Sequence, residues 1–329
     1  MKYDKVRWGI IGCGDVTEVK SGPAFQKVQN SELVAVMRRN GELAQDFAKR
    51  HNVAKWYDDA DALINDPEVD AVYIATPPGS HKEYTIKVAK AGKPVYVEKP
   101  MALNFAECEE MIAACETAGV PLYVAYYRRA QPKFVKIKEL LEAKEIGDVR
   151  FVSSMQYRQV SEDVKDLQNP PWRVQSELAG GGLFFDLASH TLDIFDFLLG
   201  PIKDVQGFAS NQAGYYRAED IVTGTYLFES GIHGVGSWCF SAFENVDVNE
   251  IVGSKGKISF STFGNDPIIM RKENEEKRWS FDRPQHVHQP LVEMIVADLT
   301  GDGGKCPSTG VTGARTNWVL GKMVENYYL

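Results

Sequence analysis

The sequence predicts an α/β protein with an N-terminal doubly wound parallel sheet and a C-terminal α+β domain with an open, mainly antiparallel sheet. Three observations lead to this prediction. Short apolar runs alternate with helical segments over the first 125 residues, two glycines follow the first run, and the runs after residue 200 have no helices between them. Alternating strands and helices give right-handed crossovers and a parallel sheet, whereas closely spaced strands give an antiparallel one.

The N-terminal strands are predicted where Val, Ile and Tyr cluster in short apolar runs, as is typical of buried strands. These runs are VRWGII at 6–11, ELVAVM at 32–37, AVYIAT at 71–76, PVYVEK at 94–99 and PLYVAY at 121–126. Helices are predicted between them at 42–52, 80–92 and 105–119. The last two helices end in Ala-Gly, where glycine can adopt the left-handed cap conformation.

The pattern changes near residues 125–130. A helix near 131–145 precedes a strand at 149–158, and further strands are expected near 202–212, 219–229, 232–241, 246–252 and 256–263. Two helices, at 289–300 and 312–328, complete the chain. We therefore predict a Rossmann dinucleotide-binding domain at 1–125 and an α+β domain for substrate binding and oligomerisation at 126–329.

Composition narrows the class of protein. The 329 residues are 44% hydrophobic and 25% charged, which is typical of globular proteins. A net charge of −8 without a Lys/Arg run argues against a nucleic-acid partner. Five scattered cysteines fit neither a disulfide framework nor a zinc site and favour a reducing compartment. No apolar run approaches the roughly 20 residues of a membrane span, so we expect a cytoplasmic protein that binds no metal and no membrane.

The run WGIIGCGDVTE places Gly12 and Gly14 directly after the first strand. Glycine allows a sharp turn and lets a pyrophosphate approach the N–H groups that open the next helix, here near Asp15 and Val16. The third position of the dinucleotide-binding fingerprint is Thr17 instead of glycine. The position after the first strand favours a dinucleotide site, and a tight turn in another α/β fold is the alternative.

Two arginines, Arg38 and Arg39, end the second predicted strand. A carboxylate at this place would accept bonds from the ribose hydroxyls and repel a 2′-phosphate. A guanidinium pairs with phosphate through a fork of donors and can stack on adenine. The pair therefore favours NADP(H) over NAD(H), and a solvated surface charge is the alternative for one of the two.

Two further motifs carry candidate chemistry. GKPVYVEKPMAL places Glu98 and Lys99 at the carboxyl end of a predicted strand, where ligands bind in open α/β sheets. GGGLFFDLASHTLDIF places Asp186 and His190 on one helical face, behind three glycines that leave room for an approaching ligand. With ATPPGSHKEY, YYRRAQPKF and VGSKGKISF, these motifs resemble the Gfo/Idh/MocA oxidoreductase family over nearly the whole chain.

The resemblance implies that Lys99, Asp186 and His190 form the catalytic set. His190 would take or give the hydroxyl proton, and an unperturbed pKa of about 6.5 suits this work at neutral pH. Lys99 would stabilise charge on the same oxygen, and Asp186 would hold a second hydroxyl or orient the base. The structural alternatives are an acid favoured by the helix dipole and a buried core histidine.

The resemblance also implies the residues around this set. Thr76, Pro77 and His81 are expected beside the cofactor, together with Glu98 and Lys99. Arg129, Trp172 and Arg173 are expected to contact substrate, with interdomain packing or a surface ion pair as the alternative. His286 and His288 are interpreted as loop residues.

These observations predict an NAD(P)(H)-dependent oxidoreductase that transfers a hydride between nicotinamide and a secondary alcohol or carbonyl of a sugar or cyclitol. One alternative is an NAD-dependent glycosidase that works by transient oxidation and elimination. Another is a non-catalytic regulator that senses a dinucleotide or sugar. The expected partner is a small carbohydrate or polyol, and we expect a homodimer or homotetramer formed through the open sheet.

Overall fold

The computed structural model describes residues 3–166 and 168–328. The chain forms two compact units. The first comprises the residues up to 102, with 106–131 and 284–314, and the second comprises 103–105, 132–283 and the residues from 315 onward. This division differs from a single boundary near 125, because the chain returns to the first unit at residue 284.

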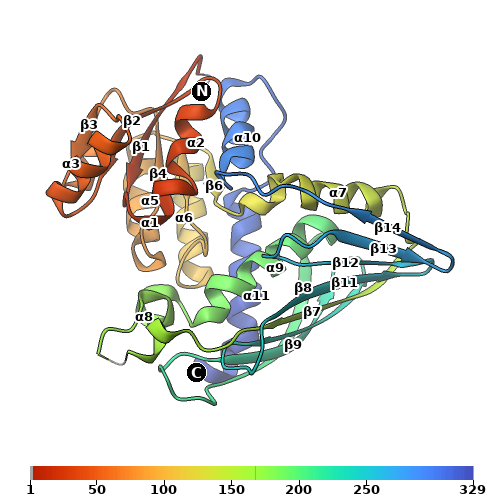
Figure 1. Ribbon diagram of the computed structural model, residues 1–329. Coiled ribbons are helices and arrows are strands. Elements are labelled where there is room, and N and C mark those ends of the chain that lie inside the picture. Colours follow the sequence, from red (N-terminus) through yellow and green to blue (C-terminus); the bar gives the residue numbers. More distant parts are fainter. Residues whose placement is uncertain (1–2, 167, 329) are drawn as a thin grey trace. The chain divides into compact units, whose positions relative to one another are not determined.

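The first unit is built on a parallel sheet with the strand order β3-β2-β1-β4-β5-β6 (Figure 1). Its strands are β1 (Val6–Ile11), β2 (Ser31–Met37), β3 (Lys55–Tyr57), β4 (Ala71–Ile74), β5 (Val95–Val97) and β6 (Leu122–Val124). The order reverses between β1 and β4, so the predicted doubly wound fold is confirmed. The sequence analysis did not predict β3, because three residues are too few to show a pattern.

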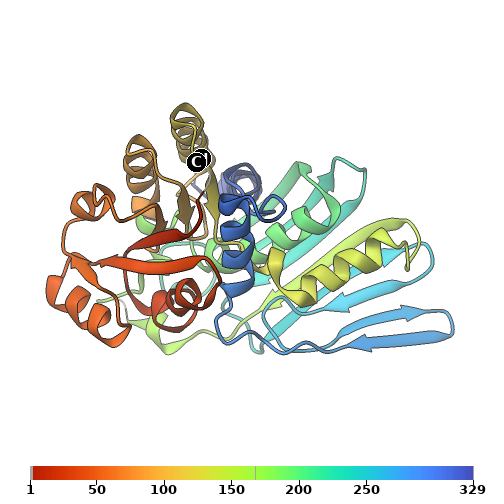
Figure 2. The same ribbon diagram turned by 90° about the horizontal axis from the view of Figure 1, so that it is seen from above.

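Helices cover both faces of this sheet (Figure 2). They are α1 (Asp15–Val19), α2 (Gly22–Lys27), α3 (Gly41–Arg50), α4 (Ala60–Ile64), α5 (His81–Lys90), α6 (Phe105–Ala118) and α10 (Gln289–Thr300). Trp8 of β1 shares a buried cluster with Phe25 of α2 and Ile295 of α10. The next residue, Gly9, faces the other side, where a Cβ would lie 2.7 Å from Leu63 of α4. Helix α10 thus completes the face that α2 begins.

Aromatic rings fill the core of the first unit. Trp8 and Phe25 lie 4.9 Å apart, and Tyr73 and Tyr96 stack at 4.8 Å between ring centroids. Each of these side chains is fully buried. Burying such a ring stabilises the fold by roughly 1.5–3 kcal/mol.

The second unit contains a mixed sheet with the order β14-β13-β12-β11-β7-β10-β9-β8. Its strands are β7 (Val149–Tyr157), β8 (Ile202–Ser210), β9 (Ile221–Phe228), β10 (His233–Cys239), β11 (Val246–Gly253), β12 (Lys257–Phe260), β13 (Ile268–Lys272) and β14 (Glu275–Trp279). The β7–β10 pair is parallel, and the other described pairs are antiparallel. The predicted open, mainly antiparallel sheet is therefore confirmed, and β13 and β14 extend it beyond the prediction.

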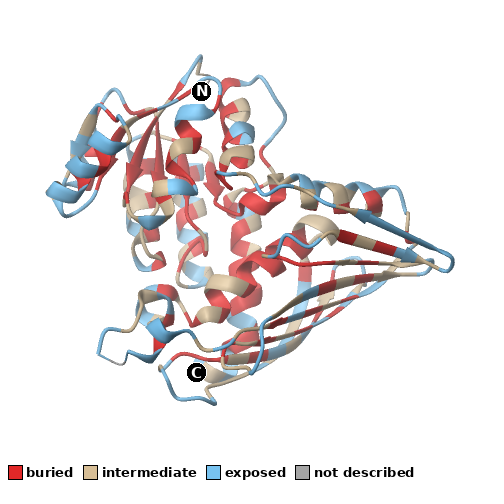
Figure 3. Ribbon diagram, viewed as in Figure 1, coloured by how far each residue is buried: buried red, intermediate tan, exposed pale blue. Residues whose placement is uncertain are grey.

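Helices cover one face of the large sheet. They are α7 (Pro132–Glu142), α9 (Leu183–Leu199) and the second half of α11 (Gly310–Tyr328), with the short α8 (Ser176–Ala179) preceding α9. Residues on the opposite face remain accessible, including Phe151, Met155, Phe208, Val235 and Val248. Figure 3 shows the contrast between the buried strands of the first unit and the partly exposed strands of this sheet. Among the described residues, no helix is long and apolar enough to cross a bilayer.

Candidate active site

The glycine loop of the first unit joins β1 to α1. Gly12 has a φ of +91°, and a Cβ there would lie 2.8 Å from Thr76 Cγ2, so glycine is required. The N–H groups of Gly12 and Cys13 donate to the carbonyl of Met37, at 2.8 and 3.1 Å. At Gly14, by contrast, a Cβ would meet only the Gly12 carbonyl oxygen, at 3.9 Å. The loop therefore has the open backbone that a dinucleotide pyrophosphate needs.

Asp15 and Val16 lie in the first turn after this loop, as the sequence predicts. The helix that they open, α1, is short, and α2 begins after a break at residues 20–21. After the break the chain packs so closely that a Cβ on Gly22 would collide with the carbonyl of Thr17, so glycine is required there. The Thr17 hydroxyl donates to the Gly14 carbonyl at 2.7 Å, so threonine closes the loop where the fingerprint has glycine.

Arg38 and Arg39 follow β2, and both side chains are exposed. The backbone is fixed on each side of the pair. Arg38 N–H donates to the Tyr57 carbonyl at 3.2 Å, and Asn40 caps α3 by accepting from the Leu43 N–H at 3.1 Å. The two guanidinium groups thus extend from a rigid point at the carboxyl end of the sheet.

A buried network supports the backbone of Lys99. The Glu98 carboxyl group accepts bonds from the Tyr73 hydroxyl at 2.5 Å and from the Lys99 backbone N–H at 3.1 Å. The His288 ring lies 3.5 Å from Glu98, and its Nδ1 lies 2.9 Å from the Tyr96 hydroxyl. Burial raises the pKa of Glu98 and lowers the pKa of His288 to about 3. His288 is therefore neutral, and the network fixes the turn from which the lysine side chain extends.

The sequence analysis missed Tyr73 and His288. It interpreted His288 as a loop residue, and His288 does lie in the segment before α10, but with 1% exposure. About 190 residues separate His288 from Glu98, so no local spacing could link them. The available signal was an unassigned histidine directly before an apolar helix.

Thr76, Pro77 and His81 lie between β4 and the first turn of α5. His81 Nε2 lies 2.7 Å from the Thr76 carbonyl, and Nδ1 lies 3.2 Å from the carbonyls of Pro100 and Met101. Burial lowers the pKa of His81 to about 4, so the ring is neutral. His81 joins the loops that follow β4 and β5, and its place beside a cofactor stays a prediction.

In the second unit, Asp186 and His190 lie four residues apart on α9. Gly182 is the N-cap of this helix and has no side chain with which to cap it. The buried Glu219 instead holds the N-cap residue itself, because its two oxygens accept the Gly182 N–H at 2.8 and 3.0 Å. The Tyr328 hydroxyl donates to the same carboxyl group at 2.5 Å. Glu219 therefore anchors the end of the helix that carries both candidate catalytic residues.

The three glycines before α9 are required by neighbours within the second unit. Gly180 has a φ of +84°, and a Cβ there would collide with the Leu103 carbonyl. A Cβ on Gly181 would collide with the Phe185 ring, and one on Gly182 would lie 2.6 Å from the Glu219 carbonyl. This close packing explains the motif in a different way from the predicted room for a ligand.

Two of the three predicted substrate residues gather at Asp186. Arg173 Nε lies 3.3 Å from Asp186 Oδ2, and the Arg173 guanidinium lies 4.6 Å from the centre of the Trp172 ring. Arg129, the third, belongs to the first unit. It is 3% exposed and donates to the Pro307 carbonyl at 3.1 Å.

Phe263 and Arg158 lie near His190 and were also missed by the sequence analysis. The His190 and Phe263 rings meet edge to face, with 5.6 Å between centroids. The Arg158 guanidinium lies 5.1 Å from the same phenyl ring. Asp247 accepts bonds from the backbone N–H groups of Thr262 and Phe263, which holds the segment after β12 in place. Tertiary pairing brings these residues together, and their sequence spacing gives no sign of it.

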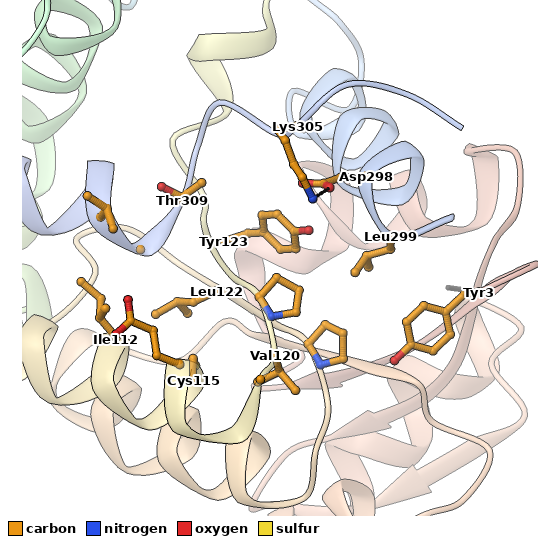
Figure 4. A pocket seen from close by; sticks show the side chains of 16 residues that line it. Tyr3, Ile112, Cys115, Val120, Leu122, Tyr123, Asp298, Leu299, Lys305 and Thr309 are labelled. Carbon is orange, nitrogen blue, oxygen red and sulfur yellow. Dashed lines mark hydrogen bonds and ion pairs between the residues drawn. The ribbon is translucent and has the colours of Figure 1, made fainter. Parts of the chain in front are cut away.

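The first unit also contains a cavity of about 410 Å³ at the amino ends of β5 and β6 (Figure 4). Its wall includes Pro94, Leu122 and Tyr123, and Lys305 pairs with Asp298 there at 2.8 Å. None of the predicted site residues lines it, so we place no step of the reaction there. Within residues 3–166 and 168–328, no three His, Cys, Asp or Glu side chains are grouped as a metal ion would require.

Comparison with known proteins identifies both parts of the chain. The family model described as "Oxidoreductase family, NAD-binding Rossmann fold" matches residues 6–126, and the "GFO/IDH/MocA C-terminal domain" matches residues 134–259. The chain is 42% identical to Oxidoreductase P35 of Formosa agariphila, over 89% of this chain and 90% of the relative. It is 32% identical to mouse trans-1,2-dihydrobenzene-1,2-diol dehydrogenase, over 76% and 73%. The crystal structure of aldose-aldose oxidoreductase from Caulobacter crescentus, complexed with glycerol, superposes with a TM-score of 0.84 at 25% identity, over 98% and 97%.

The fold and these similarities together define the class of protein. The protein is an NAD(P)-dependent oxidoreductase that acts on CH–OH groups, with an NAD-binding Rossmann fold and a second domain built on a mainly antiparallel sheet. The chain belongs to the Gfo/Idh/MocA family.

Proposed function

We propose that this oxidoreductase acts on a sugar or cyclitol and transfers a hydride between nicotinamide and one secondary alcohol or carbonyl. The observation that carries the proposal is the arrangement on α9. An acid and an imidazole share one face of a helix whose N-terminus is anchored by Glu219. Arg173 and Trp172 lie beside the acid. Hydroxyl-rich rings are bound by such combinations of charged donors and aromatic surfaces.

In the proposed mechanism, Lys99, Asp186 and His190 each have a role in the reaction. His190 removes the proton from the reacting hydroxyl during oxidation and returns it during reduction. Lys99 donates a hydrogen bond to the same oxygen and stabilises its negative charge. Asp186 accepts a bond from a neighbouring hydroxyl or orients His190. The Glu98 network fixes the Lys99 backbone, from which the lysine side chain extends.

The cofactor is proposed to bind to the first unit, and NADP(H) is favoured. The open backbone at Gly14 leaves space for a pyrophosphate, and the exposed Arg38 and Arg39 suit a 2′-phosphate. The residues that would hold the dinucleotide are Gly12, Gly14, Asp15, Val16, Arg38, Arg39, Thr76, Pro77, His81, Glu98 and Lys99. When bound, the nicotinamide supplies the hydride acceptor or donor. Arg129, Trp172 and Arg173 are proposed to contact the substrate.

The open face of the large sheet is proposed to form a homodimer or homotetramer of a cytoplasmic enzyme. Met155 pairs with Val248 in the register of β7 and β11, and Val235 and Phe151 lie close by on the same face. These four side chains are 37–46% exposed. Apolar groups gathered on one accessible face are typical of a surface that binds a partner.

The proposal is tested with myo-inositol, D-xylose and D-glucose, their keto forms and both nicotinamides. We expect net cofactor reduction with at least one polyol. Lys99→Met should lower turnover by about 100-fold or more with cofactor affinity largely retained, the scale of losing one charge-stabilising donor. The control is Lys90→Met, an exposed lysine in the last turn of α5. Near-normal turnover of Lys99→Met would remove it from the mechanism, and aryl-glycoside cleavage without net reduction would overturn the dehydrogenase proposal.

A further inference from the structure

Polar side chains without partners lie on the covered face of the large sheet. In the described part of the chain, neither amide atom of Gln156 has a hydrogen-bond partner, and the same holds for the Ser154 hydroxyl and the Trp238 indole N–H. Gln156 and Ser154 are each 2% exposed. Buried polar groups are nearly always hydrogen-bonded, so an amide with both ends unsatisfied costs free energy and calls for a binding partner.

Gln156 lies near the end of β7, beneath α9. Its register partner on β10 is Trp238, whose ring lies 5.2 Å from Phe184 in the first turn of α9. Two residues further along the chain is Arg158, which stacks on Phe263 as described above. Gln156 is therefore buried near the end of β7 that carries Arg158. Arg158 contacts the Phe263 ring, and that ring contacts His190.

The charged neighbour of Gln156 is already occupied. Asp247, its register partner on β11, accepts the backbone N–H groups of Thr262 and Phe263. The amide nitrogen of Asn249 donates to the Thr262 hydroxyl at 3.0 Å, whereas its carbonyl oxygen has no partner among the described residues. These bonds hold the segment beside His190, and among the described residues no side chain or backbone group bonds to the Gln156 amide.

We propose that Gln156 is a specificity residue that binds two adjacent hydroxyls of the substrate. Its carbonyl accepts a bond from one hydroxyl, and its NH₂ group donates to the next. This geometry selects a vicinal diol within a sugar or cyclitol and disfavours the matching deoxy compound, which leaves one end of the amide unsatisfied. The inference rests on the proposed function and extends it to the substrate class.

The test compares Gln156→Met with Tyr226→Phe. Methionine retains the length of glutamine without its polar atoms. Tyr226 is a matched control, because its buried hydroxyl also has no partner and its ring packs against Phe195 and Phe228 on the same face of the sheet. Both substitutions remove an unsatisfied polar group, so both should raise the melting temperature. Only Gln156→Met should raise KM for the best polyol of the panel, by about tenfold, with the Kd for cofactor unchanged.

A second readout does not depend on turnover. The rise in melting temperature that the polyol causes in the presence of cofactor should shrink in Gln156→Met and stay the same in Tyr226→Phe. Wild-type KM and an unchanged polyol-induced rise in Gln156→Met would overturn the inference while the proposed function stands. Absence of polyol oxidation by the wild type would overturn the proposed function itself. If Gln156→Met does not fold, Gln156→Asn takes its place. It shortens the side chain by one methylene and should give the same rise in KM and the same smaller polyol-induced rise in melting temperature.

Discussion

Substitution of Glu219 by glutamine should remove a pH dependence from the stability of the second unit. Glu219 is fully buried, and burial raises its pKa from the usual 4.5 to about 7, although the bonds from Tyr328 and Gly182 oppose this rise. The native protein therefore keeps a proton on Glu219 that the unfolded chain has already released between these pH values. The contribution of Glu219 to the free energy of unfolding is therefore greatest below pH 4.5 and falls as the pH rises towards 7.

The size of the effect follows from the same linkage. Each pH unit in this window costs about 1.4 kcal/mol, so the loss between pH 4.5 and pH 7 amounts to about 3 kcal/mol. Glutamine is neutral at every pH, and its carbonyl can still accept the Gly182 N–H. We therefore expect Glu219→Gln to match the wild type within about 1 kcal/mol at pH 4.5 and to exceed it by about 3 kcal/mol at pH 8.

Urea unfolding followed by circular dichroism at pH 4.5, 6, 7 and 8 measures this difference. Glu177→Gln is the control, because Glu177 is exposed on α8 and its loss should leave the pH profile unchanged. Parallel profiles for Glu219→Gln and wild type would refute the linkage, and so would a variant that is less stable than wild type at pH 8.

Two further substitutions test the cofactor and the assembly. Arg38→Asp should shift the preference from NADP(H) toward NAD(H) by about tenfold in kcat/KM, because a carboxylate repels the 2′-phosphate. An unchanged ratio of the two kcat/KM values would mean that Arg38 does not contact that phosphate. Val235→Lys places a charge on the open face of the large sheet, where Val235 is 46% exposed. Analytical ultracentrifugation should then show a smaller assembly than for the wild type, with melting temperature little changed. Equal sedimentation of variant and wild type would show that this face is not the subunit interface.

The parts of the fold that the sequence predicts are those with a strong local pattern. Strands β1, β2 and β4 are continuous apolar runs, and each was predicted within one or two residues of its ends. Strand β14 reads Glu-Glu-Lys-Arg-Trp and has no apolar alternation, so it was missed. The segment becomes a strand because it pairs with β13, and charged side chains are suited to the edge of a sheet.

The site shows the same limit. The glycine loop, the Glu98–Lys99 turn and the Asp186–His190 pair are short motifs, and each could be identified from a few consecutive residues. The groups that support them come from distant segments. Glu219 reaches Gly182 across 37 positions, and His288 reaches Tyr96 across 192. Only the folded chain brings such residues together, so their roles follow from burial and hydrogen bonding rather than from spacing.

The route of the chain through α10 affects how the protein can be divided. A fragment that ends at residue 131 would lack Leu291 and Ile295, which belong to the same buried cluster as Trp8. Its nucleotide half would then present bare apolar surface to water and tend to aggregate. Proteolysis or truncation at residue 131 is therefore a poor way to isolate the nucleotide-binding unit. A single polypeptide that joins residues 3–131 to 284–314 would restore α10 and its apolar contacts.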